Sequence, residues 1–215
     1  MRTTRTLIRR ACLAAVAVSA ALTLTACGGD SDDSGSAASS PSVSAETSAA
    51  AHNAQDVSFA QGMIPHHQQA VEMAGLADGR ASSPDVKDLA ARIEKAQGPE
   101  ISTMTGWLKS WDEKVPESMP GMDHSGMAGM DGMDGMDGMA GMMDSADMEK
   151  LKKTSGKDFD SMFLTMMVEH HEGAVEMATT EKAKGEDQAA TAMAGDIITA
   201  QNAEISEMKK LLGES

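Results

Sequence analysis

A gapless internal repeat constrains the fold of this chain more than any other feature of its sequence. A shift of 104 residues places Met63 on Met167 and the pair His66-His67 on His170-His171. The same shift aligns A-V-E-M-A at 70–74 with 174–178, and A-Q-x-x-E-I at 96–101 with 200–205. One structural unit is therefore present twice, and the fold must accommodate both copies.

Each copy has the pattern of two helices joined by a short break. Apolar residues recur at three- and four-residue spacing, and Ser83-Pro84 is typical of an N-cap followed by proline at the first helical position. With three phenylalanines and no tyrosine, no segment is typical of a strand. We predict an all-α fold: a four-helix bundle over residues 55–212, built from two duplicated αα-hairpins at 56–112 and 158–212. The expected helices are 56–78, 84–112, 158–182 and 187–212.

The segment between the hairpins, residues 116–148, is rich in methionine, glycine and aspartate. Its glycines disfavour both helix and strand, so we predict a disordered insertion. Low-complexity drift would explain the composition without a function. The thioether, however, is a soft ligand that selects Cu(I) over calcium, magnesium or zinc. We therefore interpret the regularly spaced methionines as a secondary metal-binding set: Met127, Met130, Met133, Met136, Met139 and Met142.

The N-terminus has the features of a bacterial lipoprotein signal peptide. Four arginines precede an apolar stretch that is short for a membrane span, and the sequence L-T-A-C ends at Cys27. We predict cleavage after residue 26, lipidation of Cys27, and an exported protein anchored at the outer face of the cell membrane. Residues 27–54 are poor in large apolar groups and are expected to form a flexible tether, with His52 in solvent.

The charge of the mature chain excludes nucleic acid as a partner. Removal of residues 1–26 takes away four of the 18 basic residues and none of the 33 acidic ones, so the net charge changes from −15 to −19. Such a chain repels phosphates and attracts cations. The mature chain keeps one cysteine, Cys27, which excludes an intramolecular disulfide and a thiolate zinc site.

Paired histidines are the strongest candidates for metal ligands. Four of the six histidines occur as two equivalent pairs, each preceded by a methionine at helical spacing. Methionines there could serve only as core filler, but buried imidazoles without partners cost free energy. We predict copper as the bound metal, with Cu(I) favoured over Cu(II). This pattern predicts His66, His67, His170 and His171 as ligands, and it leaves Met63, Met73, Met167 and Met177 open between ligand and core filler.

The returning helices are expected to bring polar groups to the same level. Counting back from the hairpin turn predicts Gln97 and Glu100 beside the first pair and Gln201 and Glu204 beside the second, as outer partners of the ligands. Pro65 and Gly98-Pro99 have no counterparts in the second unit, so a local bend is predicted in the first hairpin.

The motifs M-I-P-H-H-Q and A-V-E-M-A, their copies at 163–178, and the A-Q-x-x-E-I-x-x-M helices resemble the family called domain of unknown function 305. The resemblance covers about residues 55–212. It implies a ferritin-like four-helix bundle, export, and copper binding or copper tolerance. It also implies Met63, His66, His67 and their copies as leading ligands, with Met73 and Met177 behind them.

Two other readings of the sequence remain open. A ferritin-like di-iron oxidase would use Glu72, Glu100, Glu176 and Glu204, but a methionine stands where such sites place the glutamate of Glu-x-x-His. A structural or signalling lipoprotein without metal would leave the paired histidines unexplained. We predict a non-enzymatic protein that captures, stores or delivers copper, with a cuproprotein or copper transporter as a possible partner and with the insertion passing ions to the bundle.

Overall fold

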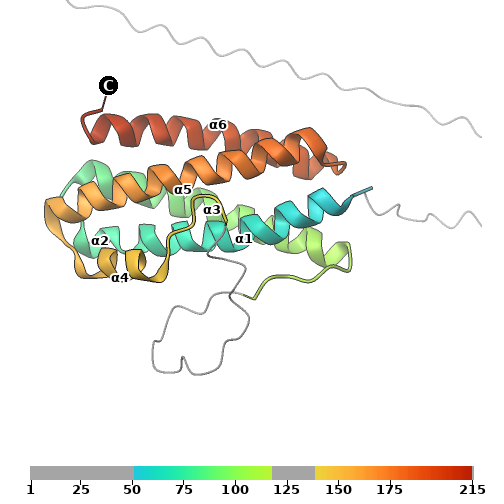
Figure 1. Cartoon of the computed structure of the whole chain (residues 1–215), viewed down its shortest axis with the longest axis horizontal. Helices are drawn as coiled ribbons and strands as arrows, with labels where there is room; N and C mark the ends of the chain where they lie inside the picture. Colours follow the sequence, from blue (N-terminus) through green and yellow to red (C-terminus); the bar gives the residue numbers. More distant parts are fainter. Residues whose placement is uncertain (1–50, 118–138, 215) are drawn as a thin grey trace, which may run out of the picture. The chain divides into compact units, whose positions relative to one another are not determined.

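The computed structural model describes residues 51–117 and 139–214, and all of their regular structure is helical (Figure 1). Within these ranges there is no strand, only one isolated bridge between Ala81 and Gly156. The predicted signal peptide, Cys27, and the insertion methionines Met127, Met130, Met133 and Met136 lie outside the described residues. The helices are α1 (Ala54–Gly75), α2 (Ala77–Arg80), α3 (Pro84–Ser110), α4 (Ser145–Lys153), α5 (Gly156–Lys184) and α6 (Gln188–Leu211).

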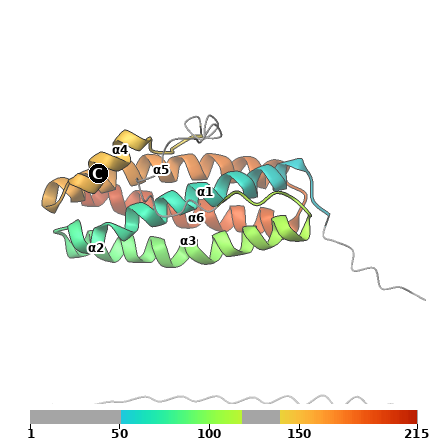
Figure 2. The same cartoon turned by 90° about the horizontal axis from the view of Figure 1, so that it is seen from below.

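The four long helices pack side by side as two hairpins, α1 with α3 and α5 with α6 (Figures 1 and 2). The hairpins meet mainly through α1 and α5, the two helices that carry the histidine pairs. Burial of apolar side chains between the hairpins is the main stabilising contribution in such a bundle. The all-α prediction is confirmed for the described residues.

Apolar side chains form two core clusters, one on either side of the histidines along the bundle. One includes Phe159, Phe163 and Leu89; the other includes Phe59 and Leu108. All five of these side chains are nearly or fully excluded from solvent. The histidine level is therefore surrounded by close-packed apolar groups, which fixes the positions of α1 and α5 relative to each other.

Two short helices were missed by the sequence analysis. Helix α4 begins inside the predicted insertion, because its first residues, after the N-cap Asp144, contain no glycine. Met148 and Leu151 bury their side chains in the core and so secure α4 to the bundle. Helix α2 occupies part of the expected break between α1 and α3, and Ser83 is the N-cap of α3 as predicted, although its side chain makes no capping bond. No helix among the described residues is long and apolar enough to cross a membrane.

A reciprocal pair of aspartates joins the two hairpins. Asp56, in the first turn of α1, accepts hydrogen bonds from the backbone N–H groups of Glu186 and Asp187 in the α5–α6 turn, at 3.0–3.1 Å. Its copy, Asp160, accepts bonds from the N–H groups of Ser82 and Ser83 in the turn before α3, both at 3.0 Å. Ser82 and Ser83 are themselves 104 residues before Glu186 and Asp187, so each unit secures the turn of the other.

The Asp56 contact also contains a second buried carboxyl group, Glu181 of α5. An ideal Cβ on Gly185 would overlap Glu181 Oε1 and lie 2.8 Å from Asp56 Oδ1, so the two carboxyl groups are close neighbours. Burial, followed by the hydrogen bond and the charge of Asp56, raises the pKa of Glu181 to about 8. Burial alone would raise the pKa of Asp56 too, but the hydrogen bonds that it accepts outweigh burial and lower it. Glu181 is therefore protonated at neutral pH and donates to an ionised Asp56.

His52 does not extend into solvent as predicted for the tether. Its ring stacks on Trp111 beyond the end of α3, with ring centroids 4.6 Å apart and planes 8° from parallel. The side chain of Asn53, the N-cap of α1, accepts hydrogen bonds from Gln55 and Asp56. The ordered domain thus begins at least two residues before α1.

Candidate metal centre

Four histidines form a buried layer midway along the bundle, two from α1 and two from α5. His66, His67, His170 and His171 are each at most 1% exposed. The rings of His66 and His170, which are equivalent in the repeat, lie in contact across the α1–α5 interface, with centroids 3.7 Å apart and planes inclined by 41°. The repeat therefore brings its two histidine pairs into one place, and we call this group the histidine layer.

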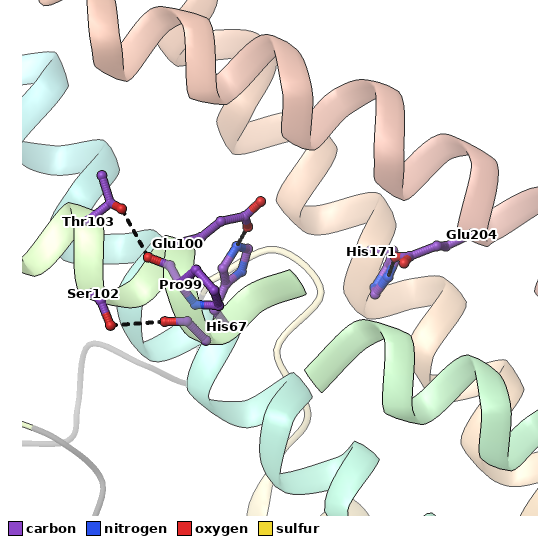
Figure 3. Close-up of polar contacts among 8 residues, drawn as sticks. His67, Pro99, Glu100, Ser102, Thr103, His171 and Glu204 are labelled. Carbon is purple, nitrogen blue, oxygen red and sulfur yellow. Dashed lines mark hydrogen bonds and ion pairs between the residues drawn. The ribbon is translucent and has the colours of Figure 1, made fainter. Parts of the chain in front are cut away.

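Two of the four rings are held by carboxylates from the returning helices (Figure 3). His67 Nε2 lies 2.6 Å from Glu100 Oε2 of α3, and His171 Nε2 lies 2.7 Å from Glu204 Oε2 of α6. Figure 3 shows the two pairs apart from one another, each within its own hairpin. The structure thus places Glu100 and Glu204 in direct contact with the histidines, at the level expected from the sequence.

His66 is held differently, by the described end of the insertion. Its Nε2 lies 3.3 Å from the carbonyl oxygen of Ala140. His170, the equivalent ring, has no hydrogen-bond partner at either nitrogen among the described residues. The two halves of the layer are therefore not equivalent.

On three of the four rings, the hydrogen-bond partner identifies the nitrogen that carries a proton. Burial, followed by the charge of His67, lowers the pKa of His66 to about 3, and burial likewise lowers the pKa of His170 well below its ordinary value. A neutral imidazole has one N–H and one lone pair. Because a carbonyl or carboxylate oxygen only accepts, Nε2 is assigned the proton in His66, His67 and His171. When such a ring is neutral, its lone pair lies on Nδ1, the nitrogen left open to a metal ion.

Unsatisfied polar atoms are concentrated in this layer. Buried polar groups in folded proteins nearly always have hydrogen-bond partners, so each exception requires an explanation. Among the described residues, buried side-chain atoms without a partner comprise Nδ1 of all four histidines, Nε2 of His170, both amide atoms of Gln97, Oε1 of Gln201, and both carboxyl oxygens of Glu181. All except the Glu181 oxygens belong to predicted ligands or their predicted outer partners, and the proton of Glu181 satisfies its own carboxyl group by bonding to Asp56.

Most of the predicted methionine ligands are buried near the same interface. Met63, Met73 and Met167 are fully excluded from solvent, whereas Met177 is partly exposed. Met139 is also partly buried. An ideal Cβ on Gly62 would lie 3.3 Å from Met139 Cε and 3.7 Å from Met177 Sδ. The last residues of the insertion therefore bring a thioether next to Met177. Met142 lies nearby in the chain and is partly exposed.

A short segment at the end of the insertion, residues 139–143, crosses the layer, and we call it the strap. Gln69 binds Met143 through both of its amide atoms, donating to the carbonyl oxygen and accepting from the N–H, each at 2.8 Å. On the other side, a Cβ at Gly173 would overlap the Ala140 carbonyl group. Gly141 has φ of +78°, which favours glycine, and packs against the backbone of α5.

Gln69 and Gly173 are equivalent in the repeat, yet they differ in type. Sequence reasoning did not single them out, because it looked for identity between the copies. The replacement of glutamine by glycine between the two copies was the signal in the sequence that could have identified these positions.

Helices α1 and α3 are continuous through Pro65 and Pro99. Beyond Pro99, the hydroxyl of Thr103 donates to the Pro99 carbonyl oxygen at 3.0 Å, and Ser102 bonds similarly to Gly98 at 3.1 Å (Figure 3). The prolines are therefore accommodated without ending either helix.

The donors of the layer suit a soft ion better than a hard one. Among the described residues, no group of three or more histidine, cysteine, aspartate or glutamate side chains is arranged to hold a metal ion. A site here would need methionine sulfur to complete its coordination, and mixed imidazole and thioether donors are typical of copper sites.

The chain resembles known proteins over the whole helical domain. A family described as "Domain of unknown function (DUF305)" matches residues 56–212. No curated protein matches the chain.

Several solved structures match the fold. The crystal structure of a DUF305 protein from Streptomyces coelicolor, assigned as secreted, is 31% identical, covers 74% of this chain and 91% of its own, and has a TM-score of 0.63. CopM in its Cu(II)-bound form is 35% identical, with 74% and 95% coverage and a TM-score of 0.59. A DUF305 fragment from Deinococcus radiodurans is 27% identical, with 75% and 97% coverage and a TM-score of 0.62. CopM has also been solved with Cu(I), with silver, and in the apo form.

Proposed function

Since this chain belongs to the DUF305 family, we propose that it is an exported copper-binding protein whose principal site is the histidine layer. The observation that carries this proposal is the concentration of buried imidazole nitrogens and amide atoms without hydrogen-bond partners, on the histidines of α1 and α5 and on the glutamines of α3 and α6. Leaving such atoms unpaired costs about 1–3 kcal/mol each. A bound ion that accepts their lone pairs would offset this cost. The related protein CopM binds Cu(II), Cu(I) and silver.

We assign the ligands to the residues that the repeat duplicates. His66, His67, His170 and His171 supply imidazole nitrogen, and Met63 and Met167 supply thioether sulfur, with Met73 and Met177 as further sulfur donors. Glu100 and Glu204 accept from Nε2 of their histidines, which leaves Nδ1 to the ion and raises its basicity. Gln97 and Gln201 are outer partners, since both amide atoms of Gln97 and Oε1 of Gln201 are buried without a hydrogen-bond partner.

The expected ion is Cu(I), with Cu(II) as a second possibility. Thioether sulfur is soft and uncharged and prefers Cu(I), whereas imidazole binds either oxidation state. The chain is then a carrier or store and not an enzyme. The insertion methionines Met127, Met130, Met133, Met136, Met139 and Met142 would collect ions and pass them inward. A cuproprotein or a copper transporter would be the partner on delivery.

We further propose that the protein is anchored to the membrane through a lipid on Cys27. The support is the L-T-A-C sequence after an apolar segment, and the linker composition that follows it. Mass spectrometry of the exported protein would detect a diacylated N-terminal cysteine. An N-terminus at any other residue contradicts the assignment.

The di-iron alternative loses support in the fold. It requires four carboxylates near the histidines. Of the four candidates, only Glu100 and Glu204 contact a histidine; Glu72 pairs with Lys152 at 2.8 Å, and Glu176 is exposed.

The test is a Cu(I) competition titration against a chromophoric chelator, using the purified exported protein. A variant with alanine at positions 66, 67, 170 and 171 should lose its tightest ion, with at least a hundredfold weaker binding. His52→Ala is the matched control, because it removes a histidine that lies outside the layer. Unchanged tight binding by the fourfold variant would contradict the proposal.

A second measurement remains informative if the fourfold variant fails to fold. In the intact protein labelled with ¹⁵N at histidine, Ag(I) should shift the Nδ1 resonances of the layer and leave Nε2 of His67 and His171 bonded to glutamate. A shift confined to His52 would contradict the assignment.

A further inference from the structure

A groove on the outer face of α5 contains three methionines that belong to none of the sites described so far. It has a volume of about 460 Å³ and lies between α4, α5 and the strap. Met143, Met162 and Met166 line it, together with the carboxylates of Asp147, Asp158 and Glu169. We call this group the methionine groove.

The three thioethers border the groove from α5 and the strap, and Met162 Sδ accepts a hydrogen bond from the Thr154 hydroxyl at 3.9 Å. Met162 and Met166 are four residues apart on α5 and therefore share one face of the helix. Met143 belongs to the strap, where two hydrogen bonds between its backbone and the Gln69 side chain fix its position. Met143 and Met162 are partly exposed, and Met166 is 8% exposed, so all three border space that an ion can enter. The flexible methionine side chain has three rotatable bonds and can turn its sulfur toward a common point.

All three methionines contribute to packing, since Met166 belongs to a core cluster and Met143 and Met162 pack against it, but the first unit packs without them. The residues equivalent to Met162 and Met166 in the first unit are Ser58 and Gly62, so the shared fold does not require a large apolar side chain at either position. Met143 lies in the insertion and has no counterpart in the first hairpin. The groove is therefore formed by α4, α5 and the strap and has no counterpart in the first unit.

The chemistry of the lining selects the ion. Three carboxylates against one lysine, Lys150, give the groove a negative charge that attracts cations. Among the described residues no three histidine, cysteine, aspartate or glutamate side chains form a metal site, which argues against both the hard ion Ca²⁺ and the borderline ion Zn²⁺ here. Thioether sulfur prefers soft monovalent ions.

We propose that Met143, Met162 and Met166 form a second binding site, in the methionine groove, for one soft monovalent cation, Cu(I) or Ag(I). This site is separate from the histidine layer. It lies beside it, because Glu169 of the groove precedes His170 and the strap that carries Met143 also covers His66.

The experiment uses Ag(I) and the full chain, expressed with its own leader and purified, in chloride-free buffer. Native mass spectrometry counts bound ions, and ¹³C-methyl labelling of methionine reports which thioethers respond. With silver, the ε-methyl resonances of Met143, Met162 and Met166 should shift together. The variant M143L/M162L/M166L should bind one ion fewer than the parent, because leucine keeps the volume and removes the sulfur.

The matched control is Met193→Leu, which changes a partly buried methionine of α6 outside the groove. It should bind as many ions as the parent. Equal ion counts for the parent and the triple variant, or methyl shifts that do not occur together, would overturn the proposal. The fourfold histidine variant separates this site from the histidine layer, since it should keep the shifts of the three groove methyls whether or not the layer binds copper.

Discussion

Replacing Glu181 with glutamine should remove a large part of the pH dependence of folding stability. Glu181 is fully buried against Asp56, and its pKa is raised to about 8 from an ordinary value of 4.5. In the folded protein its proton is therefore retained at neutral pH, whereas in the unfolded chain it is lost. Glutamine keeps a donor for the Asp56 carboxylate but cannot ionise.

The sign and size follow from linkage. A raised pKa in the folded state means that the stabilising contribution of Glu181 is complete below pH 4.5 and is lost as the pH rises toward 8. Each pH unit between these values changes the free energy of unfolding by about 1.4 kcal/mol. Between pH 5 and pH 7.5, the wild-type protein should lose about 3 kcal/mol relative to the glutamine variant. The lowered pKa of Asp56 acts in the opposite direction, but only below its ordinary value of 3.8.

The assay is urea unfolding followed by circular dichroism at pH 5, 6 and 7.5, with a chelator present to keep the histidine layer free of metal. The buried histidines also contribute to the pH dependence, so the quantity of interest is the difference between wild type and variant, in which their contribution cancels. Glu176→Gln is the matched control, because it removes an exposed carboxylate from the same helix. A wild-type-minus-variant difference that stays constant within about 1 kcal/mol would refute the reasoning.

Three further perturbations test other parts of the structure. Glu204→Ala should weaken Cu(I) binding about 10- to 100-fold in a competition titration, because the carboxylate orients its histidine ligand, whereas Glu207→Ala on the same helix should leave it unchanged. Gly173→Ala should displace the strap, since its Cβ would overlap the Ala140 carbonyl, and hydrogen exchange should then quicken at residues 139–143 without a loss of helix content. Asp160→Ala should lower the free energy of unfolding by about 2–3 kcal/mol, measured by urea titration, because two backbone N–H groups lose their acceptor; retained stability would show that water replaces it.

The helices and the position of the site could be predicted from sequence because both depend on short-range spacing. Apolar residues at three- and four-residue intervals define the buried faces of α1, α3, α5 and α6. The repeat further predicts that the two hairpins have the same structure. Counting from the turn placed Glu100 and Glu204 at the level of the histidines, and the structure has them in contact.

The strap and α4 could not be predicted in the same way. Both depend on where a segment of irregular composition crosses the bundle. The spacing of residues within that segment does not predict this position. The pairing of Asp56 and Asp160 each with the turn of the other hairpin could have been predicted, because the two aspartates are related by the 104-residue shift. The stacking of His52 on Trp111 could not be predicted, since these residues lie at opposite ends of the first hairpin in sequence and no motif links them.

Sequence differences between the two repeat units explain how the histidine layer can contain two different histidine environments. His66 and His170 are equivalent in sequence, in burial and in their contact with each other. They differ because Gln69 binds the strap while Gly173, at the equivalent position, makes room for it. The strap then occupies Nε2 of His66 and leaves both nitrogens of His170 free. The insertion thereby makes the two halves of the layer inequivalent without altering any of the donor side chains that the duplication supplied.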